Sequence, residues 1–139
     1  MNKINNVNIE GVKAFEEKIM NDFSLARKTQ GVEGEWILEE GNTQFVSKIK
    51  FEGGETEFKV DNPTFMGGSC SLPGPMHYCF YGLASCYTGT FATMAAMLGI
   101  KLKKLTTKVE ADVNFSKVFG ISEEPIMEEV RVKLIVVSD

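Results

Sequence analysis

A long stretch without formal charge is the feature that most constrains the fold of this chain. From Asn62 to Ile100 the sequence contains no Asp, Glu, Lys or Arg, and Lys101, Lys103 and Lys104 follow it. A stretch of this length can cross a lipid bilayer if it is helical. Three structures therefore have to be distinguished: a membrane span, an inert buried helix, and a helix that carries a reactive thiol.

Composition and flanking sequence favour a buried helix over a membrane span. Polar residues such as Ser85, Thr88 and Thr93 dilute the apolar ones. The segments on both sides alternate apolar and charged residues, which is typical of strands that fold back over a helix. We therefore expect a soluble domain with no membrane partner. The N-terminal sequence lacks the apolar core of a secretory signal, so a cytoplasmic location is expected.

The bounds of the helix can be read from its ends. Pro75 suits the first turn of a helix, and Gly99 suits a position just after its end. A helix between them has about 23 residues and a length of about 35 Å, which exceeds the diameter of a small core. One side is therefore expected to pack against a second copy of the chain, giving a homodimer. Small residues along it allow close backbone approach: Gly82, Ala84, Ser85 and Gly89.

The rest of the chain predicts an α+β order within a single domain, residues 1–139. Apolar residues three and four apart predict an amphipathic helix from Asn8 to about Arg27. Alternation of apolar and polar residues then predicts five strands, the first three as an antiparallel meander with one solvent-facing side. These strands are expected at residues 36–38, 45–51, 58–60, 102–115 and 129–137.

Charge and ligand residues exclude several classes of partner. The net charge is −4 and the arginines are two, Arg27 and Arg131, so a nucleic-acid surface is not expected. The single histidine, His77, has cysteines two and nine residues after it, which is not a zinc-type ligand pair. No metal and no cofactor are therefore predicted.

The cysteines, Cys70, Cys79 and Cys86, are too few and odd in number for a disulfide framework, so free thiols are expected. Cys79 and Cys86 share one face of the predicted helix but lie about 10 Å apart along it. A disulfide needs Cα atoms within about 7 Å, so these two cannot pair within one helix. Each could be a small buried hydrophobe or a reactive thiol, and the residues alone leave this open.

The run DNPTFMGGSCSLPGPMHYCFYGLASCYTGTFATMAAMLGIKLKKLTTKVEADV resembles the OsmC/Ohr superfamily, the osmotically inducible and organic hydroperoxide resistance proteins. The shared features are an Asp-x-Pro loop with a Gly-Gly pair, a helix led by proline with a small-small-Cys step, and Gly-Ile-x-Leu before a strand. The resemblance covers about residues 8–139. It implies an OsmC-like fold, an antiparallel sheet with a long buried central helix in an intertwined homodimer.

The resemblance also implies an activity. Active members are thiol peroxidases of the oxidative stress response, which reduce organic hydroperoxides. A peroxidatic thiolate becomes a sulfenic acid, a resolving cysteine closes a disulfide, and a dithiol donor reduces it. The peroxidatic position falls on Cys86, in Leu-Ala-Ser-Cys.

The chain departs from the pattern of active members at three points. Met76 stands where they carry a glutamate, and the segment Glu35–Val60 lacks their arginine, for which Lys48 or Lys50 would be point-charge substitutes. The resolving cysteine of the family lies in a C-terminal helix beyond a Ser-Asp such as the one that ends this sequence. The sequence therefore predicts a domain that lacks the family's C-terminal helix and strand, through truncation or loss.

Two functions remain open from the sequence. The first is a thiol-dependent hydroperoxide reductase that uses Cys86, with Cys70 or Cys79 as a stand-in for the resolving thiol. The second is a non-catalytic OsmC-fold homodimer that binds a small apolar ligand or a partner chain, with the thiol of Cys86 serving as packing.

Overall fold

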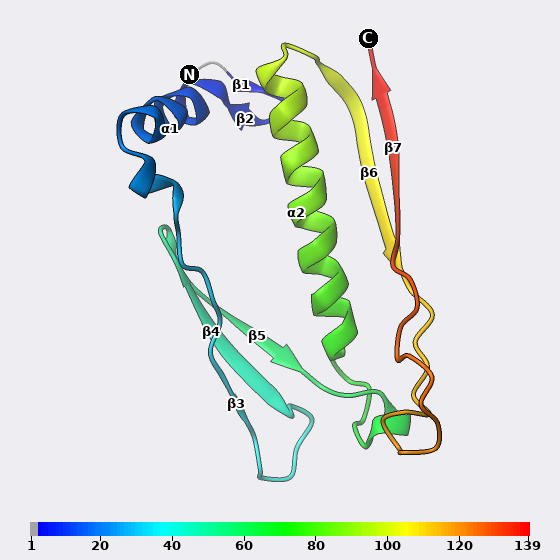
Figure 1. Cartoon of the computed structure of the whole chain (residues 1–139). Coiled ribbons are helices and arrows are strands. Elements are labelled where there is room, and N and C mark those ends of the chain that lie inside the picture. Colours follow the sequence, from blue (N-terminus) through cyan, green and yellow to red (C-terminus); the bar gives the residue numbers. More distant parts are fainter. Residues whose placement is uncertain (1–2) are drawn as a thin grey trace. The chain divides into compact units, whose positions relative to one another are not determined.

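Two α-helices and three small antiparallel sheets make up residues 3–139, the part of the chain that the computed structural model describes (Figure 1). This confirms the predicted α+β class. The chain forms two compact units: one contains the residues up to Phe23 together with Phe80–Asp139, and the other contains Ser24–Cys79.

The first unit begins with a short hairpin that the sequence had not predicted. Strands β1 (Lys3–Ile4) and β2 (Val7–Asn8) pair antiparallel around Asn5 and Asn6, whose φ angles are 54° and 63°. Asparagine tolerates this left-handed conformation better than most residues, and two such residues suit a tight hairpin turn. The Asn-Asn pair between Ile4 and Val7 is the signal that was missed.

Helix α1 (Ile9–Asn21) begins where it was predicted to begin, because the Asn8 side chain accepts a hydrogen bond from the Gly11 N–H at 3.2 Å. It ends earlier than the predicted Arg27. Asp22 is extended, and a 3-10 helix (Phe23–Ala26) takes the place of the last turns. The prediction was wrong here because the apolar spacing continues past the residue at which the backbone leaves the helix.

Helix α2 (Pro75–Met97) confirms both predicted ends of the uncharged helix. At its C-terminus Gly99 adopts φ 75°, its N–H donates to the Ala96 carbonyl at 3.0 Å, and the Ile100 N–H donates to the Ala95 carbonyl at 2.9 Å. This pair of hydrogen bonds is the Schellman motif, which satisfies backbone carbonyls that a helix end leaves without a partner. No helix within residues 3–139 has the length and apolarity needed to cross a membrane.

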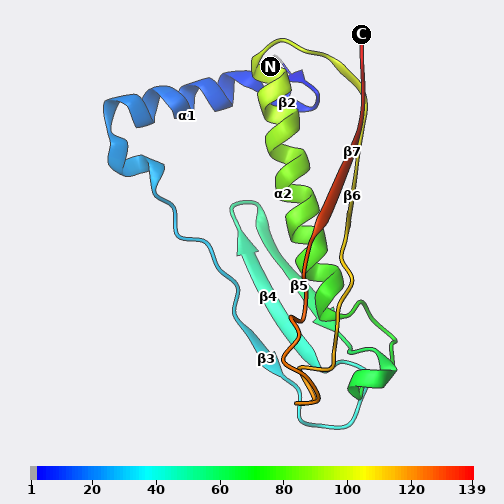
Figure 2. The same ribbon diagram turned by 45° about the vertical axis from the view of Figure 1, so that its right-hand side comes forward.

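Strands β6 (Leu102–Glu110) and β7 (Arg131–Ser138) form an antiparallel pair, and α2 runs alongside it in both views (Figures 1 and 2). The first strand is shorter than predicted, because the chain after Glu110 turns into a loop held by an isolated bridge between Val113 and Met127. The Asn5 side chain fixes the entry to β6: it donates to the Ile100 carbonyl at 2.9 Å and accepts from the Leu102 N–H at 2.8 Å.

Within the first unit, helix α2 is covered on one side only. Ala95 and Ala96 are its buried residues, whereas large apolar side chains on its other side are exposed, including Leu83, Tyr87 and Met94. Within the first unit the helix is therefore half-covered rather than enclosed. A second chain was expected to bury the exposed side of α2, and the homodimer stays a prediction.

The second unit contains the predicted meander. Strands β3 (Gly34–Trp36), β4 (Phe45–Phe51) and β5 (Gly54–Val60) form one antiparallel sheet in that order. The bounds of β4 match the prediction, β3 ends earlier than predicted and β5 begins earlier. A 3-10 helix (Thr64–Met66) and a Gly-Ser-Pro loop then lead to the first turn of α2.

Candidate thiol site on the central helix

Cys86 lies at the middle of α2, and its side chain is exposed to solvent. Cys70 and Cys79 are exposed as well, and all three cysteines are free thiols. Exposure is a requirement for a reactive thiol, and a buried structural cysteine does not meet it. Within the described chain, therefore, Cys86 is accessible rather than packed as a small buried hydrophobe.

The orientation of Cys86 follows from its neighbours two residues away on each side. Ala84 and Thr88 are both half-buried, and Thr88 faces β6, where its Oγ1 lies 2.5 Å from the Oγ1 of Thr107. Because each helical residue turns by about 100°, Cys86 lies about 160° around the helix from both neighbours. Its thiol therefore points away from the β6–β7 pair.

Large apolar side chains are exposed on the side of α2 that carries Cys86, alongside the exposed Thr90. Leu83 is 40% exposed, Tyr87 50% and Met94 56%. The helix has no acidic residue in its first turn and no basic residue in its last, and the rest of it is uncharged. A cation able to stabilise a thiolate at Cys86 must therefore come from outside α2.

Cys79 lies two turns earlier than Cys86 in the same continuous helix. The prediction that these two cysteines cannot form a disulfide within one chain therefore holds.

The other residues singled out from the sequence lie in the second unit. Met76 occupies the first turn of α2 directly after Pro75, as the resemblance implied. Lys48 and Lys50 are exposed on β4, and their register partners across the sheet are Glu57 and Glu55. Opposite charges in register attract one another, so these lysines already have acidic neighbours.

Asp61 is a buried polar residue whose contacts sequence reasoning missed. It is only 1% exposed, and its carboxylate accepts hydrogen bonds from the hydroxyls of Ser69 and Ser71, at 2.6 and 3.0 Å, and from both of their backbone N–H groups. These bonds, that from the Ser69 hydroxyl foremost, lower the pKa of Asp61 to about 2. The signal was present as an aspartate of the Asp-x-Pro motif followed by Ser-Cys-Ser.

Further hydrogen bonds and one close backbone approach hold the loop that runs from Asp61 to Ser71. Cys70, between the two serines, has a φ of 58°, and its N–H donates to the Asn62 carbonyl at 3.2 Å. The Gln44 side chain accepts from the Asn62 N–H at 2.9 Å and donates to the Gly67 carbonyl at 3.1 Å. A Cβ on Gly68 would lie 1.9 Å from the Asn62 carbonyl oxygen, so this position requires glycine. The Gly-Gly pair thus belongs to a rigid lead-in to α2.

The first turn of α2 is held by two further polar contacts. His77 Nδ1 accepts from the Gly74 N–H at 3.1 Å, which gives this histidine the structural role at the helix start that the sequence allowed. The Tyr78 hydroxyl donates to the Lys59 carbonyl on β5 at 2.8 Å. Within residues 3–139, no three His, Cys, Asp or Glu side chains are grouped as a metal ion would require.

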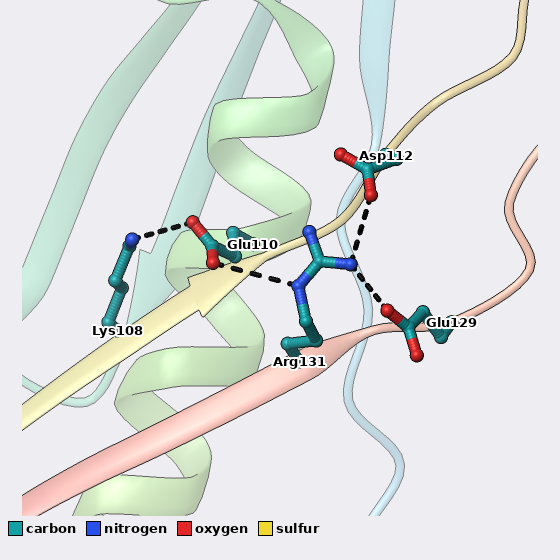
Figure 3. A network of polar contacts seen from close by, with 5 residues as sticks. All are labelled: Lys108, Glu110, Asp112, Glu129 and Arg131. Atoms are coloured by element: carbon teal, nitrogen blue, oxygen red, sulfur yellow. Dashed lines mark hydrogen bonds and ion pairs between the residues drawn. The ribbon is translucent and has the colours of Figure 1, made fainter.

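Arg131 lies at the centre of a charged network at the ends of β6 and β7 (Figure 3). Its guanidinium contacts Glu129 at 2.5 Å, Asp112 at 3.0 Å and Glu110 at 3.6 Å. Hydrogen bonds to Glu129 and Asp112 raise the pKa of Arg131, and the nearby Lys108 ammonium lowers the pKa of Glu110. Three carboxylates thus engage this guanidinium, which differs from the arginine that the resemblance assigns to a thiolate.

The chain matches the sequence model of a known family. Residues 68–139, slightly more than half of the chain, match the sequence model of the family described as OsmC-like protein. The matched part contains the Gly-Gly pair, α2 with Cys86, and the β6–β7 pair. No curated protein matches the chain.

Proposed function

The chain belongs to the OsmC-like protein family, and on that basis we propose that it is a thiol-dependent hydroperoxide reductase with Cys86 as its peroxidatic residue. The observation that carries the proposal is the exposure of Cys86 at the middle of α2, inside the part of the chain that matches the family. Because Cys86 points away from β6, its accessible thiol is free to meet a substrate.

The proposed reaction is a two-electron reduction of an organic hydroperoxide. The Cys86 thiolate attacks the terminal peroxide oxygen, the S–O bond forms as the O–O bond breaks, and the alkoxide leaves and takes up a proton as an alcohol. A second thiol then attacks the sulfur of the sulfenic acid and releases hydroxide, which becomes water. A dithiol reductant returns the resulting disulfide to two thiols, as a reducing, cytoplasmic setting would allow.

The surroundings of Cys86 suit an organic rather than an inorganic peroxide. Leu83, Tyr87 and Met94 are exposed on the side of α2 that carries the thiol. Apolar side chains next to a nucleophile favour the hydrocarbon part of a substrate, because its burial removes apolar surface from water. This apolar side also supports a homodimer, in which a second chain covers what the first leaves exposed.

A second candidate function rests on the same apolar side of α2. A non-catalytic OsmC-fold protein that binds a small apolar ligand or a partner chain would use Leu83, Tyr87 and Met94 for contact and Cys86 only for packing. Two observations favour it: Met76 stands in the place of the glutamate, and carboxylates engage Arg131. It is the alternative against which the peroxidase must be tested.

The test is consumption of cumene hydroperoxide in the presence of a dithiol reductant, with matched serine substitutions of each cysteine. We expect Cys86→Ser to lose turnover by at least about a hundredfold, because a serine hydroxyl is a far weaker nucleophile than the thiolate that the proposed reaction requires. Cys70→Ser serves as the control for a thiol outside α2 and should retain the first oxidation step. Equal peroxide consumption by the wild type and Cys86→Ser would support the binding function instead.

A further inference from the structure

We propose that Thr107, on β6, is a positioning residue for Cys86 that acts through the hydroxyl of Thr88. As a statement about hydroperoxide reduction this rests on the proposed function, whereas the orientation of the thiol can be measured separately. A pair of threonine hydroxyls joins α2 to β6, with the Oγ1 atoms of Thr88 and Thr107 2.5 Å apart.

The direction of each hydrogen bond in this pair is fixed by chemistry. Thr88 Oγ1 lies 2.6 Å from the Ala84 carbonyl oxygen, which can only accept, so the one hydroxyl proton of Thr88 goes there. The hydroxyl of Thr107 must then donate to Thr88 Oγ1. The result is a chain of two hydrogen bonds, from Thr107 on β6 to Thr88 and from Thr88 to the Ala84 carbonyl of α2. Ala84 and Thr88 each lie two residues from Cys86, one before it and one after it.

The rest of this interface does little to set the rotation of the helix. Ala84 and the buried Ala95 share the side of α2 that carries Thr88, and the larger Phe91 on that side is 37% exposed. Small side chains allow a helix to turn about its axis with little change in packing, whereas a half-buried polar pair has one arrangement in which both hydroxyls are satisfied. A polar pair in an apolar seam therefore specifies register.

Rotation of α2 translates directly into displacement of the thiol. Cys86 lies about 160° around the helix from Thr88, so the two move in opposite directions when the helix turns. For an atom about 4 Å from the axis, a rotation of about 15° gives a displacement of about 1 Å. Misplacement of a reacting group by about 1 Å can slow a reaction by about a hundredfold. The Thr107 hydroxyl is thus expected to affect Cys86 without touching it.

The chain offers a matched control on the same strand. Thr106 is exposed on the opposite face of β6, and it makes no side-chain hydrogen bond among those observed in residues 3–139. Thr107→Val removes the donor but keeps the side-chain shape, and Thr106→Val makes the same chemical change outside this chain of hydrogen bonds. Thr107→Ser restores the hydroxyl, and Thr107→Ala is a second removal should the valine variant fail to fold.

Two readouts on the full chain test the proposal. The first is the rate of Cys86 oxidation by cumene hydroperoxide, followed at peptide level by mass spectrometry. The second is the pH profile of Cys86 alkylation by iodoacetamide, which needs no peroxidase activity. We expect Thr107→Val to slow oxidation by at least about tenfold and shift the alkylation profile, Thr107→Ser to restore both, and Thr106→Val to stay within about twofold of the wild type.

The outcomes separate this inference from the proposed function. Equal behaviour of Thr107→Val and Thr106→Val in both readouts overturns it, and so does a slow Thr107→Ser variant, because then the hydroxyl is not what matters. If wild-type Cys86 does not react with the peroxide, the proposed function fails and alkylation alone decides the positioning role. A shifted profile in Thr107→Val or Thr107→Ala, but not in Thr106→Val, then still supports it.

Discussion

At the scale of single residues, the polar groups that organise this protein were harder to anticipate than the thiol. The position of Cys86, and that of Met76 after Pro75, could be predicted because both depend on spacing within one helix. The roles of Asp61 and Thr107 could not, since each depends on a partner brought near by folding. The sequence does not distinguish a buried aspartate that accepts four hydrogen bonds, such as Asp61, from an exposed one.

Asp61 should make the stability of the protein depend on pH in the acid range. Its pKa is about 2 in the folded state against an ordinary value of 3.8, so the folded state binds its proton less readily. Its stabilising contribution is therefore fully present above about pH 4 and is lost as the pH falls through about 2. We expect the melting temperature, followed by circular dichroism from pH 6 to pH 2, to fall across this interval.

The matched variant for this prediction is Asp61→Asn. It should melt at a lower temperature than the wild type at pH 6, because a neutral amide is a weaker acceptor than the carboxylate for the Ser69 and Ser71 donors. Its melting temperature should also depend less steeply on pH between about 4 and 2. An unchanged acid dependence in Asp61→Asn would show that other carboxylates cause it.

At the scale of elements, periodicity and end signals predicted the long helix well and the short elements poorly. The bounds of α2 and β4 agree with expectation because a proline, a Gly99 cap and strict alternation mark them. The β1–β2 hairpin was missed because two-residue strands carry almost no periodic signal. Helix α1 was predicted to end too late, because the spacing of apolar residues does not indicate that the backbone of Asp22 leaves the helical conformation.

The C-terminal cap of α2 gives a prediction at this scale. Gly99 has a φ of 75° with open space around its Cα, so a side chain there meets no neighbour but adopts a strained backbone conformation. Gly99→Ala should therefore lower the free energy of unfolding by about 1 kcal/mol. Urea denaturation measures it. Gly41→Ala, also in open space and without a positive φ, is the control, and an equal loss in both variants would contradict the account.

At the scale of the whole molecule, the exposed side of α2 is the feature that a single chain does not explain. The sequence predicted one domain that pairs with a second copy, and both remain predictions. They rest on the same physical reason: an uncharged helix of 23 residues exposes apolar side chains to water when only one side is covered. What covers the other side cannot be read from periodicity, because a core face and an interface face have the same pattern.

Association in solution tests this directly. We expect sedimentation to give about twice the 15.4 kDa mass of the chain, and Leu83→Glu to give the monomer mass, because a charge in an apolar interface has no partner. Leu25→Glu is the matched control, since Leu25 is 37% exposed against 40% for Leu83 but lies on the 3-10 helix rather than on α2. A wild-type protein that stays monomeric at high concentration would contradict the homodimer.

The most direct test of the central claim is the identity of the residue that a hydroperoxide oxidises first. The protein is treated with one equivalent of cumene hydroperoxide in the presence of dimedone, which traps a sulfenic acid, and the modified peptide is identified by mass spectrometry. The account predicts a dimedone adduct on Cys86, formed before any change at Cys70 or Cys79. An adduct on either of those residues, or none at all while the peroxide persists, would contradict it.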